Sequence, residues 1–296
     1  STFKIVAVSG CMNDGIISPD DIIDCSISSV QKGTKRLRLP GDHHPLGKIS
    51  VRKVVQKSSN RGAAQLGIKL GSERLYEYCR AFGFGQKTGF GIGGERKGIL
   101  HHPKNWDGLT ITRLPMGHAV SATAMQVHGA MSTVANGGVL MQPKFINRVF
   151  DEDGKTVTPF NVKPVRRVID SMVAKSLTEM LVSVVSTEGT AKNARIKGFD
   201  VAGKTGTTQK IINGKYSRNH HVGSFVGFFP AEKPRIVITV VVDEAKMKRG
   251  MLGYGGTVAA PAFQNVAKQI ISYLGIQPKK VEEKVAVNLN STKQIF

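Results

Sequence analysis

The pattern of apolar residues changes once along this chain, and that change constrains the fold more than any other feature. Strand-like runs follow one another at residues 199–209, 221–230 and 235–244. Short links that carry glycine or proline join these runs, which is typical of an antiparallel meander. Helical patterns lie before and after them. We therefore predict an α+β fold in which an antiparallel sheet is flanked by helices.

The helical patterns differ in how much of their surface is apolar. Residues 2–12 are apolar on almost every side, which predicts a helix buried inside the domain. Ser50 and Ser121 are predicted to cap two later helices. Residues 18–48 are polar and rich in glycine and proline, and indicate loops and short pieces. The remaining helices are predicted at residues 49–57, 71–85, 121–138, 170–186 and 258–275.

Two observations bear on the extent of the domain. Three strands make a thin sheet for this many helices, so we expect further strands upstream of residue 1. Residues 276–296 are charged and polar, and we expect a mobile tail there. The predicted helices and strands thus lie within residues 1–275, and the tail follows over 276–296.

The charge balance indicates the kind of partner. The 296 residues carry a formal net charge of +21, which favours anionic partners. The basic residues are scattered, and the densest run, residues 32–38, has no aromatic residues between its charges, so we expect no specific nucleic-acid binding. The longest strongly apolar run, Ile236–Val242, is too short to span a bilayer. Either the protein is soluble or its anchor lies outside this chain.

The cysteines, histidines and glycine-rich loop predict neither a metal site nor a cofactor site. Cys11, Cys25 and Cys79 match no disulfide framework or metal spacing, so we expect buried free thiols. A Cys11–Cys25 bridge stays open if the compartment is oxidising. Each histidine pair has too few ligands for a metal, and we expect solvated side chains. These pairs stand at 43–44, 101–102 and 220–221, and the glycine-rich loop at 89–98 lacks the Lys-Ser/Thr ending of a phosphate loop.

The stretch DVAGKTGTTQK, residues 200–210, combines residues with opposite preferences. Threonine suits a strand, whereas glycine inside a strand weakens it unless something must approach the backbone closely. This combination predicts a strand edge along which a ligand lies.

A possible nucleophile stands at the start of the predicted buried helix. The spacing of Ser1 and Lys4 places the hydroxyl and the amine on one helix face. A serine needs a base to act as a nucleophile, and burial favours the neutral amine of a lysine. The helix N-terminus also favours negative charge that develops beside it. The spacing alone is weak evidence, because Ser29–Lys32 and Ser50–Lys53 share it.

Two more short motifs make the spacing of Ser1 and Lys4 significant. Ser58-Ser59-Asn60 follows a short predicted helix and can direct a hydroxyl and an amide into one cleft. Lys204-Thr205-Gly206-Thr207 continues the first predicted strand. Each motif has a decoy elsewhere in the chain, at 217–219 and 87–89. In this order and these contexts, however, the three motifs are the signature of penicillin-recognising acyl-serine enzymes.

Longer stretches narrow this resemblance. STFKIVAVSGCMNDGIISPDDIIDC, SATAMQVHGAMSTVANGGVLMQPKFI and YGGTVAAPAFQNVA resemble the transpeptidase domain of class B penicillin-binding proteins, of the division and sporulation type. The resemblance covers nearly all of residues 1–275. It implies the fold shared by penicillin-binding proteins and serine β-lactamases, with the N-terminal strands missing from this chain, and it implies that residue 1 is a cut point.

The resemblance also implies roles for the motif residues. Ser1 would attack the D-Ala-D-Ala bond of a peptidoglycan stem peptide, and Lys4 would take its proton. Ser58 would relay a proton to the leaving amine, and Asn60 would bind the acyl-side amide and hold Lys4. Lys204 would keep this network poised. The hydroxyls of Thr205 and Thr207 would bind the substrate carboxylate, and Gly206 would leave room for the substrate. The backbone N–H groups of Thr207 and Ser1 would form the oxyanion hole.

Partners and location follow from the same resemblance. The expected partners are peptidoglycan stem peptides, β-lactams, a membrane glycosyltransferase, and divisome or elongation proteins. A membrane anchor is expected upstream, which would place the catalytic domain on the outer face of the cell membrane. No cofactor is expected.

Two departures from the family pattern and several rival functions remain open. LPMGHAVSA, residues 114–122, stands where the family has a Ser-x-Gly-x-Gly-like turn, and Arg61 after the second motif is unusual. Both are expected to alter only the cleft rim or the affinity for β-lactams. The alternatives are a serine β-lactamase, a D,D-carboxypeptidase and a penicillin-sensing receptor module. A basic scaffold that binds an anionic wall polymer is a weaker one.

Overall fold

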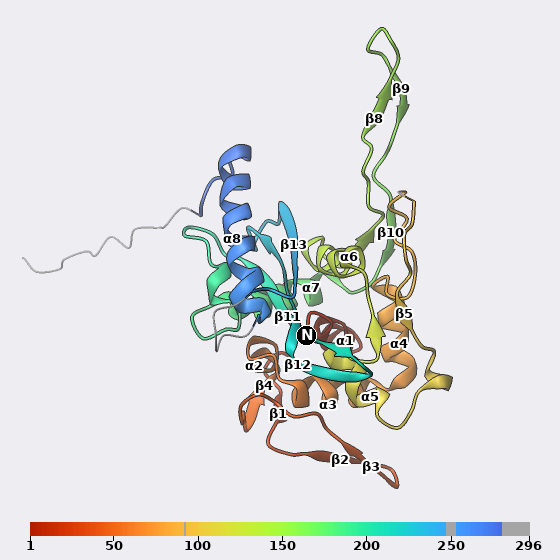
Figure 1. Cartoon of the computed structure of the whole chain (residues 1–296), viewed down its shortest axis with the longest axis vertical. Coiled ribbons are helices and arrows are strands. Elements are labelled where there is room, and N and C mark those ends of the chain that lie inside the picture. The colour runs from red at the N-terminus through yellow and green to blue at the C-terminus, as the bar shows by residue number, and fades with distance from the viewer. Residues whose placement is uncertain (92, 247–252, 280–296) are drawn as a thin grey trace, which may run out of the picture.

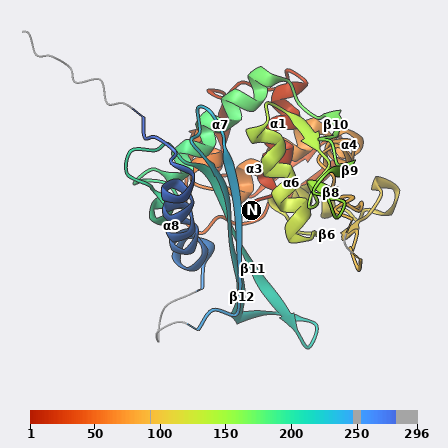
Figure 2. The same cartoon turned by 90° about the horizontal axis from the view of Figure 1, so that it is seen from above.

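The computed structural model describes residues 1–91, 93–246 and 253–279. Its main sheet is an antiparallel meander of three strands in the order β11-β12-β13, which confirms the prediction. The strands span Ala202–Ile212, Lys215–Phe229 and Ile236–Asp243, so the first begins later than predicted, the second is longer and the third is shorter. Asn213 and Gly214 join the first two, and both have positive φ, as a two-residue hairpin turn requires. Figure 2 shows the far end of this hairpin projecting from the body.

Helices cover both faces of the sheet, which confirms the α+β prediction. Helix α8 (Gly255–Leu274) lies along one face, where Phe263 packs edge to face against Phe225 at a ring-centroid distance of 4.8 Å. The other helices lie on the opposite side (Figure 2). They are α1 (Lys4–Asn13), α2 (Val51–Gln56), α3 (Asn60–Leu70), α4 (Ser72–Ala81), α5 (Thr110–Arg113), α6 (Ala124–Ala135) and α7 (Ser171–Val185).

Helix α1 is the centre of this second layer. It packs against α3, α4 and α7, and eight of its ten residues are buried, as its all-round apolar pattern predicts. Because Lys4 is the first residue of this helix, its side chain starts from the interior of the domain. The fold therefore buries an amine next to the sheet.

One expectation about a helix start was wrong, and one helix was not predicted. Helix α6 is capped by Thr123, whose hydroxyl accepts from the N–H group of Gln126 while Gln126 bonds back, a reciprocal capping box. Ser121, the expected cap, lies in a short strand instead. Helix α3 had no predicted counterpart, although Ser59 caps it by accepting from the N–H group of Gly62. The cap predicted at Ser50 is confirmed.

Short two-stranded sheets lie outside the main sheet. One of them, the hairpin of β8 and β9, projects well away from the body (Figure 1). These strands are β1 (Ile22–Asp24) with β4 (Lys48–Ser50), β2 (Ser29–Lys32) with β3 (Lys35–Arg38), β5 (Ile99–Leu100) with β6 (Val120–Ser121), β7 (Val139–Met141) with β10 (Pro164–Arg167), and β8 (Arg148–Phe150) with β9 (Thr156–Pro159). Three 3₁₀ turns lie at Pro103–Asn105, Leu114–Met116 and Lys192–Ala194.

The cysteines and the chain end complete the comparison with the predictions. Cys11, Cys25 and Cys79 are buried free thiols, as expected. The backbone N–H of Lys279 donates to the carbonyl of Gly198 at 3.0 Å, so the first residues after α8 pack on the body. The rest of the expected tail, from residue 280, lies outside the described residues.

Candidate active site

The hydroxyl of Ser1 and the amine of Lys4 meet at the N-terminal end of α1. Lys4 Nζ lies 3.0 Å from Ser1 Oγ, as the spacing predicts. Ser1 precedes the first helical residue, and the N–H group of Lys4 bonds to the carbonyl of Ser1. The lysine side chain is only 1% exposed. A buried base thus lies within hydrogen-bond distance of a possible nucleophile, which is the arrangement that activates a serine.

The second motif lies directly against this pair. Lys4 Nζ is 2.9 Å from Ser58 Oγ, 2.6 Å from the Ser58 carbonyl oxygen and 2.8 Å from Asn60 Oδ1. Asn60 Nδ2 donates to the carbonyl of Gly41, which fixes the amide with its oxygen toward the lysine. The motif is not simply a loop, because Asn60 begins α3 while Ser58 lies before it with a φ of 58°.

Counting protons shows what this environment does to Lys4. The Ser58 carbonyl and Asn60 Oδ1 can only accept, so they take both hydrogens of a neutral amine. The lone pair of that amine then faces the two hydroxyls, Ser1 Oγ and Ser58 Oγ. Each hydroxyl can donate to it. The geometry therefore suits a neutral lysine that is ready to accept a proton from a serine.

The third motif joins the network through Ser58. Lys204 on β11 is fully buried, and its Nζ donates to Ser58 Oγ at 2.8 Å. Ser58 Oγ thus lies between two lysine amines. The continuous path Ser1–Lys4–Ser58–Lys204 connects α1, the turn before α3 and the central sheet, segments that are about 200 residues apart in the chain.

Both lysines have pKa values below the usual range. Burial is the main cause at Lys4, and the charge of Lys204 lowers the pKa further, while Asp42 opposes the shift. Burial lowers the pKa of Lys204 to about 7. Neutral amines are therefore accessible near physiological pH at both positions.

The threonines and the glycine of the third motif occupy the sheet edge. Among the described residues, β11 pairs only with β12, so its other edge is open to a ligand. Thr205 Oγ1 lies 2.9 Å from Thr190 Oγ1, and Thr207 Oγ1 accepts from the N–H group of Gly255 at 3.1 Å. Both threonine side chains are thereby held in fixed rotamers.

Gly206 lies where an added side chain would crowd its neighbours. A Cβ atom there would be 2.4 Å from Ser224 Oγ and 3.2 Å from Thr2 Cγ2. A pocket of about 230 Å³ opens at this point, and Ser1 and Gly206 both line it. The nucleophile therefore shares this pocket with Gly206 and Thr208 of β11, whereas Thr205 and Thr207 are not among the residues that line it.

Asp42 is a site residue that the sequence did not reveal. Its carboxylate accepts from Ser59 Oγ at 2.7 Å and from the N–H groups of Asn60 and Arg61. It therefore caps α3 and holds the turn that presents Ser58. Asp42 lies in a polar segment with no periodic pattern, so the sequence carries no local signal of this contact. Thr190, which holds Thr205, is likewise invisible in the sequence.

The two departures from the family pattern both lie beside the site. Gly117 packs against the nucleophile, because a Cβ atom there would be 3.3 Å from Ser1 N. The next residue, His118, has a buried Nδ1 without a hydrogen-bond partner among the described residues. Arg61 donates to the carbonyls of Cys25 and Ser26, so it ties α3 to the neighbouring loop.

The histidines partly depart from the prediction. His221 is buried rather than solvated, because it packs edge-on against Tyr254 with ring centroids 5.9 Å apart. His43 approaches the same tyrosine at 6.1 Å. In the described part of the chain, no three His, Cys, Asp or Glu side chains gather as a metal cluster, and no helix has the length and apolarity needed to cross a membrane.

Known proteins have sequences similar to this chain. A family model described as the penicillin binding protein transpeptidase domain matches residues 1–270. Stage V sporulation protein D of Bacillus subtilis is 37% identical over the whole chain, which covers 45% of that protein. A protein named probable peptidoglycan D,D-transpeptidase PenA, from Neisseria flavescens, is 30% identical over 95% of this chain and 65% of its own length. The chain thus spans less than two thirds of these relatives.

Solved structures agree with the sequence matches. Penicillin-binding protein 3 of Mycobacterium tuberculosis, complexed with ampicillin, superposes with a TM-score of 0.84 at 32% identity. The match covers 96% of this chain and 63% of that one. The transpeptidase domain of Burkholderia pseudomallei penicillin-binding protein 3 gives a TM-score of 0.80 at 28% identity, over 95% of this chain and 80% of that chain. The chain belongs to the penicillin-binding protein transpeptidase domain family, among class B proteins of the division and sporulation type.

Proposed function

We propose that this chain is the catalytic domain of a peptidoglycan D,D-transpeptidase, which cross-links stem peptides through an acyl-serine intermediate. The observation that carries the proposal is the hydrogen-bonded path from Ser1 through Lys4 and Ser58 to Lys204. The path supplies a nucleophile, a base and a proton relay in one buried network. The named transpeptidases among its relatives support the same activity.

Acylation uses the path in one direction. Ser1 Oγ attacks the carbonyl carbon of the penultimate D-Ala, and its proton passes to neutral Lys4. The carbon–nitrogen bond to the terminal D-Ala then breaks. Ser58 Oγ, between the two amines, passes a proton to the nitrogen of that leaving D-Ala and regains one from Lys4. An ester on Ser1 and free D-Ala result.

Transfer to the acceptor reverses the roles. The amine of a second stem peptide attacks the ester carbonyl, loses a proton to the network and forms the new amide bond. Ser1 Oγ leaves and regains its proton from Lys4. β-Lactams resemble the D-Ala-D-Ala end and acylate the same oxygen, but their ester is not resolved in this way.

Substrate binding falls to β11. The stem peptide lies along the open edge of this strand, with Gly206 leaving room beside Ser1. The hydroxyls of Thr205 and Thr207 and the charge of Lys204 bind its terminal carboxylate. Asn60 binds the acyl-side amide. The N–H groups of Ser1 and Thr207 stabilise the oxyanion, and one such donor is typically worth about 10²–10³ in rate.

The wider role belongs to the whole protein rather than to this domain. We infer a place in cell-wall synthesis on the outer face of the cell membrane, beside a membrane glycosyltransferase and division or elongation proteins. The names of two relatives, a sporulation protein and a peptidoglycan D,D-transpeptidase, support the place in cell-wall synthesis.

Labelling with a fluorescent penicillin tests the proposal. The full-length protein is expected to take up one label, and Ser1→Ala is expected to abolish it. Ser29→Ala is the matched control, because Ser29–Lys32 has the same spacing but lies on an exposed hairpin. Labelling that survives Ser1→Ala contradicts the mechanism.

Measurements of turnover and products distinguish a transpeptidase from a β-lactamase and a D,D-carboxypeptidase, which also form acyl-serine intermediates. A chromogenic cephalosporin is expected to give a stoichiometric burst and then almost no turnover. Rapid continuous hydrolysis instead indicates a β-lactamase. With a stem-peptide donor and an amine acceptor, the cross-linked product is expected, whereas release of D-Ala alone indicates a carboxypeptidase.

A further inference from the structure

The hairpin that projects from the body exposes apolar side chains that water does not favour. We call residues 144–163 the arm; it contains β8 and β9 (Figure 1). A two-stranded hairpin is marginally stable alone, and large exposed apolar patches usually mark interaction sites. The exposed large apolar residues of the arm are Phe145 (69%), Ile146, Val149, Phe150, Val157 (61%), Phe160 and Val162 (65%).

Charge is divided along the arm. Its carboxylates are all at the tip, at Asp151, Glu152 and Asp153, beside a single cation, Lys155. The other cations, Lys144, Arg148 and Lys163, lie on the strands and toward the base. None of the arm's charged groups forms an ion pair with any described residue. The arm thus has an acidic end, a basic end and apolar side chains between them.

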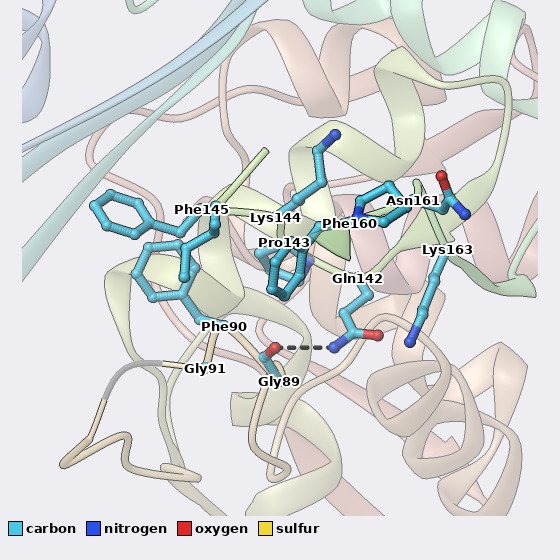
Figure 3. A pocket seen from close by; sticks show the side chains of 12 residues that line it. Gly89, Phe90, Gly91, Gln142, Pro143, Lys144, Phe145, Phe160, Asn161 and Lys163 are labelled. Carbon is cyan, nitrogen blue, oxygen red and sulfur yellow. Dashed lines mark hydrogen bonds between the residues drawn. The ribbon is translucent and has the colours of Figure 1, made fainter. Parts of the chain in front are cut away.

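A pocket of about 520 Å³ lies at the basic end (Figure 3). The rings of Phe90 and Phe145 meet edge to face at 5.5 Å on one side of it. Lys144 and Lys163 line it, and no carboxylate does. Gln142 Nε2 donates to the carbonyl of Gly89, which ties the glycine-rich loop to the base of the arm. The pocket therefore suits a ligand that is apolar and carries carboxylates.

We propose that a second copy of this chain fills the site, with the two arms antiparallel and each acidic tip at the basic pocket of the other. The charge pattern is self-complementary only in this orientation. A two-fold axis brings the tip of each arm to the base of its partner, as a closed dimer requires. The apolar side chains in the middle of the two arms then cover each other.

The acidic tip argues against a membrane surface as the alternative. An apolar and basic hairpin suits anionic lipid headgroups, but the three consecutive carboxylates at the tip would be repelled by them. Two arms of this length also form an interface at the small end of the range for specific pairs. We therefore expect a dimer that dissociates in the micromolar range.

Sedimentation equilibrium of the full-length protein tests the dimer through paired charge reversals. Lys144→Glu/Lys163→Glu makes both ends of the arm acidic, and Glu152→Lys/Asp153→Lys makes both basic. Each pair is expected to raise the dimer dissociation constant about tenfold or more. The four changes together reverse both ends and are expected to return the constant to within about threefold of the original.

The fourfold variant also guards against a folding artefact, because a misfolded arm would not regain affinity. Labelling by fluorescent penicillin, which none of these residues contacts, reports that each variant is folded. A protein that stays monomeric at about 100 μM, or a dimer indifferent to the reversals, overturns the proposal. So does a monomer that binds vesicles of anionic phospholipid through Phe150, since that result places the arm on a membrane instead.

Discussion

The active-site cleft and the arm both break the rule that polar groups lie outside and apolar groups inside, but they break it in opposite directions. The cleft buries two lysines, and both amines have hydrogen-bond partners within the chain. The arm exposes large apolar side chains, and none of its charged groups forms an ion pair with the described part of the chain. A buried polar group destabilises the fold unless it is hydrogen-bonded within the chain, whereas an exposed apolar surface can be covered later by a binding partner. We conclude that the cleft is complete within one chain, whereas the arm needs a partner to complete its binding surface.

Loss of the lysine at the centre of the cleft should give the largest effect. Lys4→Met keeps the volume of the side chain but removes the base and its four polar contacts. We expect the rate of acylation by a fluorescent penicillin to fall by about 10³ or more, since general-base catalysis contributes about 10²–10⁴. Lys53→Met is the control, because Lys53 completes the decoy Ser50-x-x-Lys53 and should leave the rate unchanged. Fast acylation in Lys4→Met contradicts the idea of a complete buried network.

The carboxylate that holds the second motif should have the next largest effect. Asp42→Ala frees the turn before α3 and leaves Ser58 in its positive-φ conformation without this support. We expect acylation to slow about 10–100-fold and, because a helix cap is lost, the free energy of unfolding to drop by about 1 kcal/mol. Asp20→Ala removes a carboxylate that only pairs with Arg52 at the surface. If both variants acylate equally, Asp42 has no positioning role.

The sequence predicted the cleft better than the arm, and the reason lies in the range of the interactions. The all-round apolar character of residues 2–12 and the strand-like run at 199–209 are local signals, so the buried helix and the meander could be predicted. The three short motifs could be joined because their order and contexts match a known family. No local pattern, in contrast, marks Asp42 or Thr190 as partners of Ser59 and Thr205.

The helix boundaries and the arm show where local signals fail. Ser121 looks like a helix cap, but Thr123 and Gln126 form a reciprocal pair that a single serine cannot match. Residues 139–168 carried no clear periodicity, because strands that expose both faces to water need not alternate apolar with polar residues. A surface that is completed by a partner has no signature within one chain.

The pH dependence of acylation tests how the charges of Lys204 and Asp42 act on the pKa of Lys4. Acylation needs neutral Lys4, so its rate is expected to fall as the pH drops through the lowered pKa of this amine. Lys204→Gln removes a charge that lowers the pKa of Lys4, so the acid limb should move to higher pH. Asp42→Asn removes a charge that raises the pKa, so the limb should move to lower pH. Pre-steady-state acylation rates between about pH 5 and 9 measure both midpoints, and the lowered rate of either variant does not affect its midpoint. Shifts in the same direction contradict the assignment.

The smallest effect is expected where the arm is changed in a monomer. Phe150→Ser and Val157→Ser remove exposed apolar side chains of the projecting hairpin, so at low protein concentration the acylation rate should stay within about twofold. The free energy of unfolding should change by no more than about 0.5 kcal/mol, as for other surface substitutions. Both quantities are measured at about 0.1 μM, where a weak dimer is dissociated. The small change in acylation rate in the arm variants then contrasts with the large loss in Lys4→Met. This contrast distinguishes a site that is complete in one chain from a site that needs a partner. A large loss of acylation in either arm variant would mean that the arm supports the cleft within a single chain.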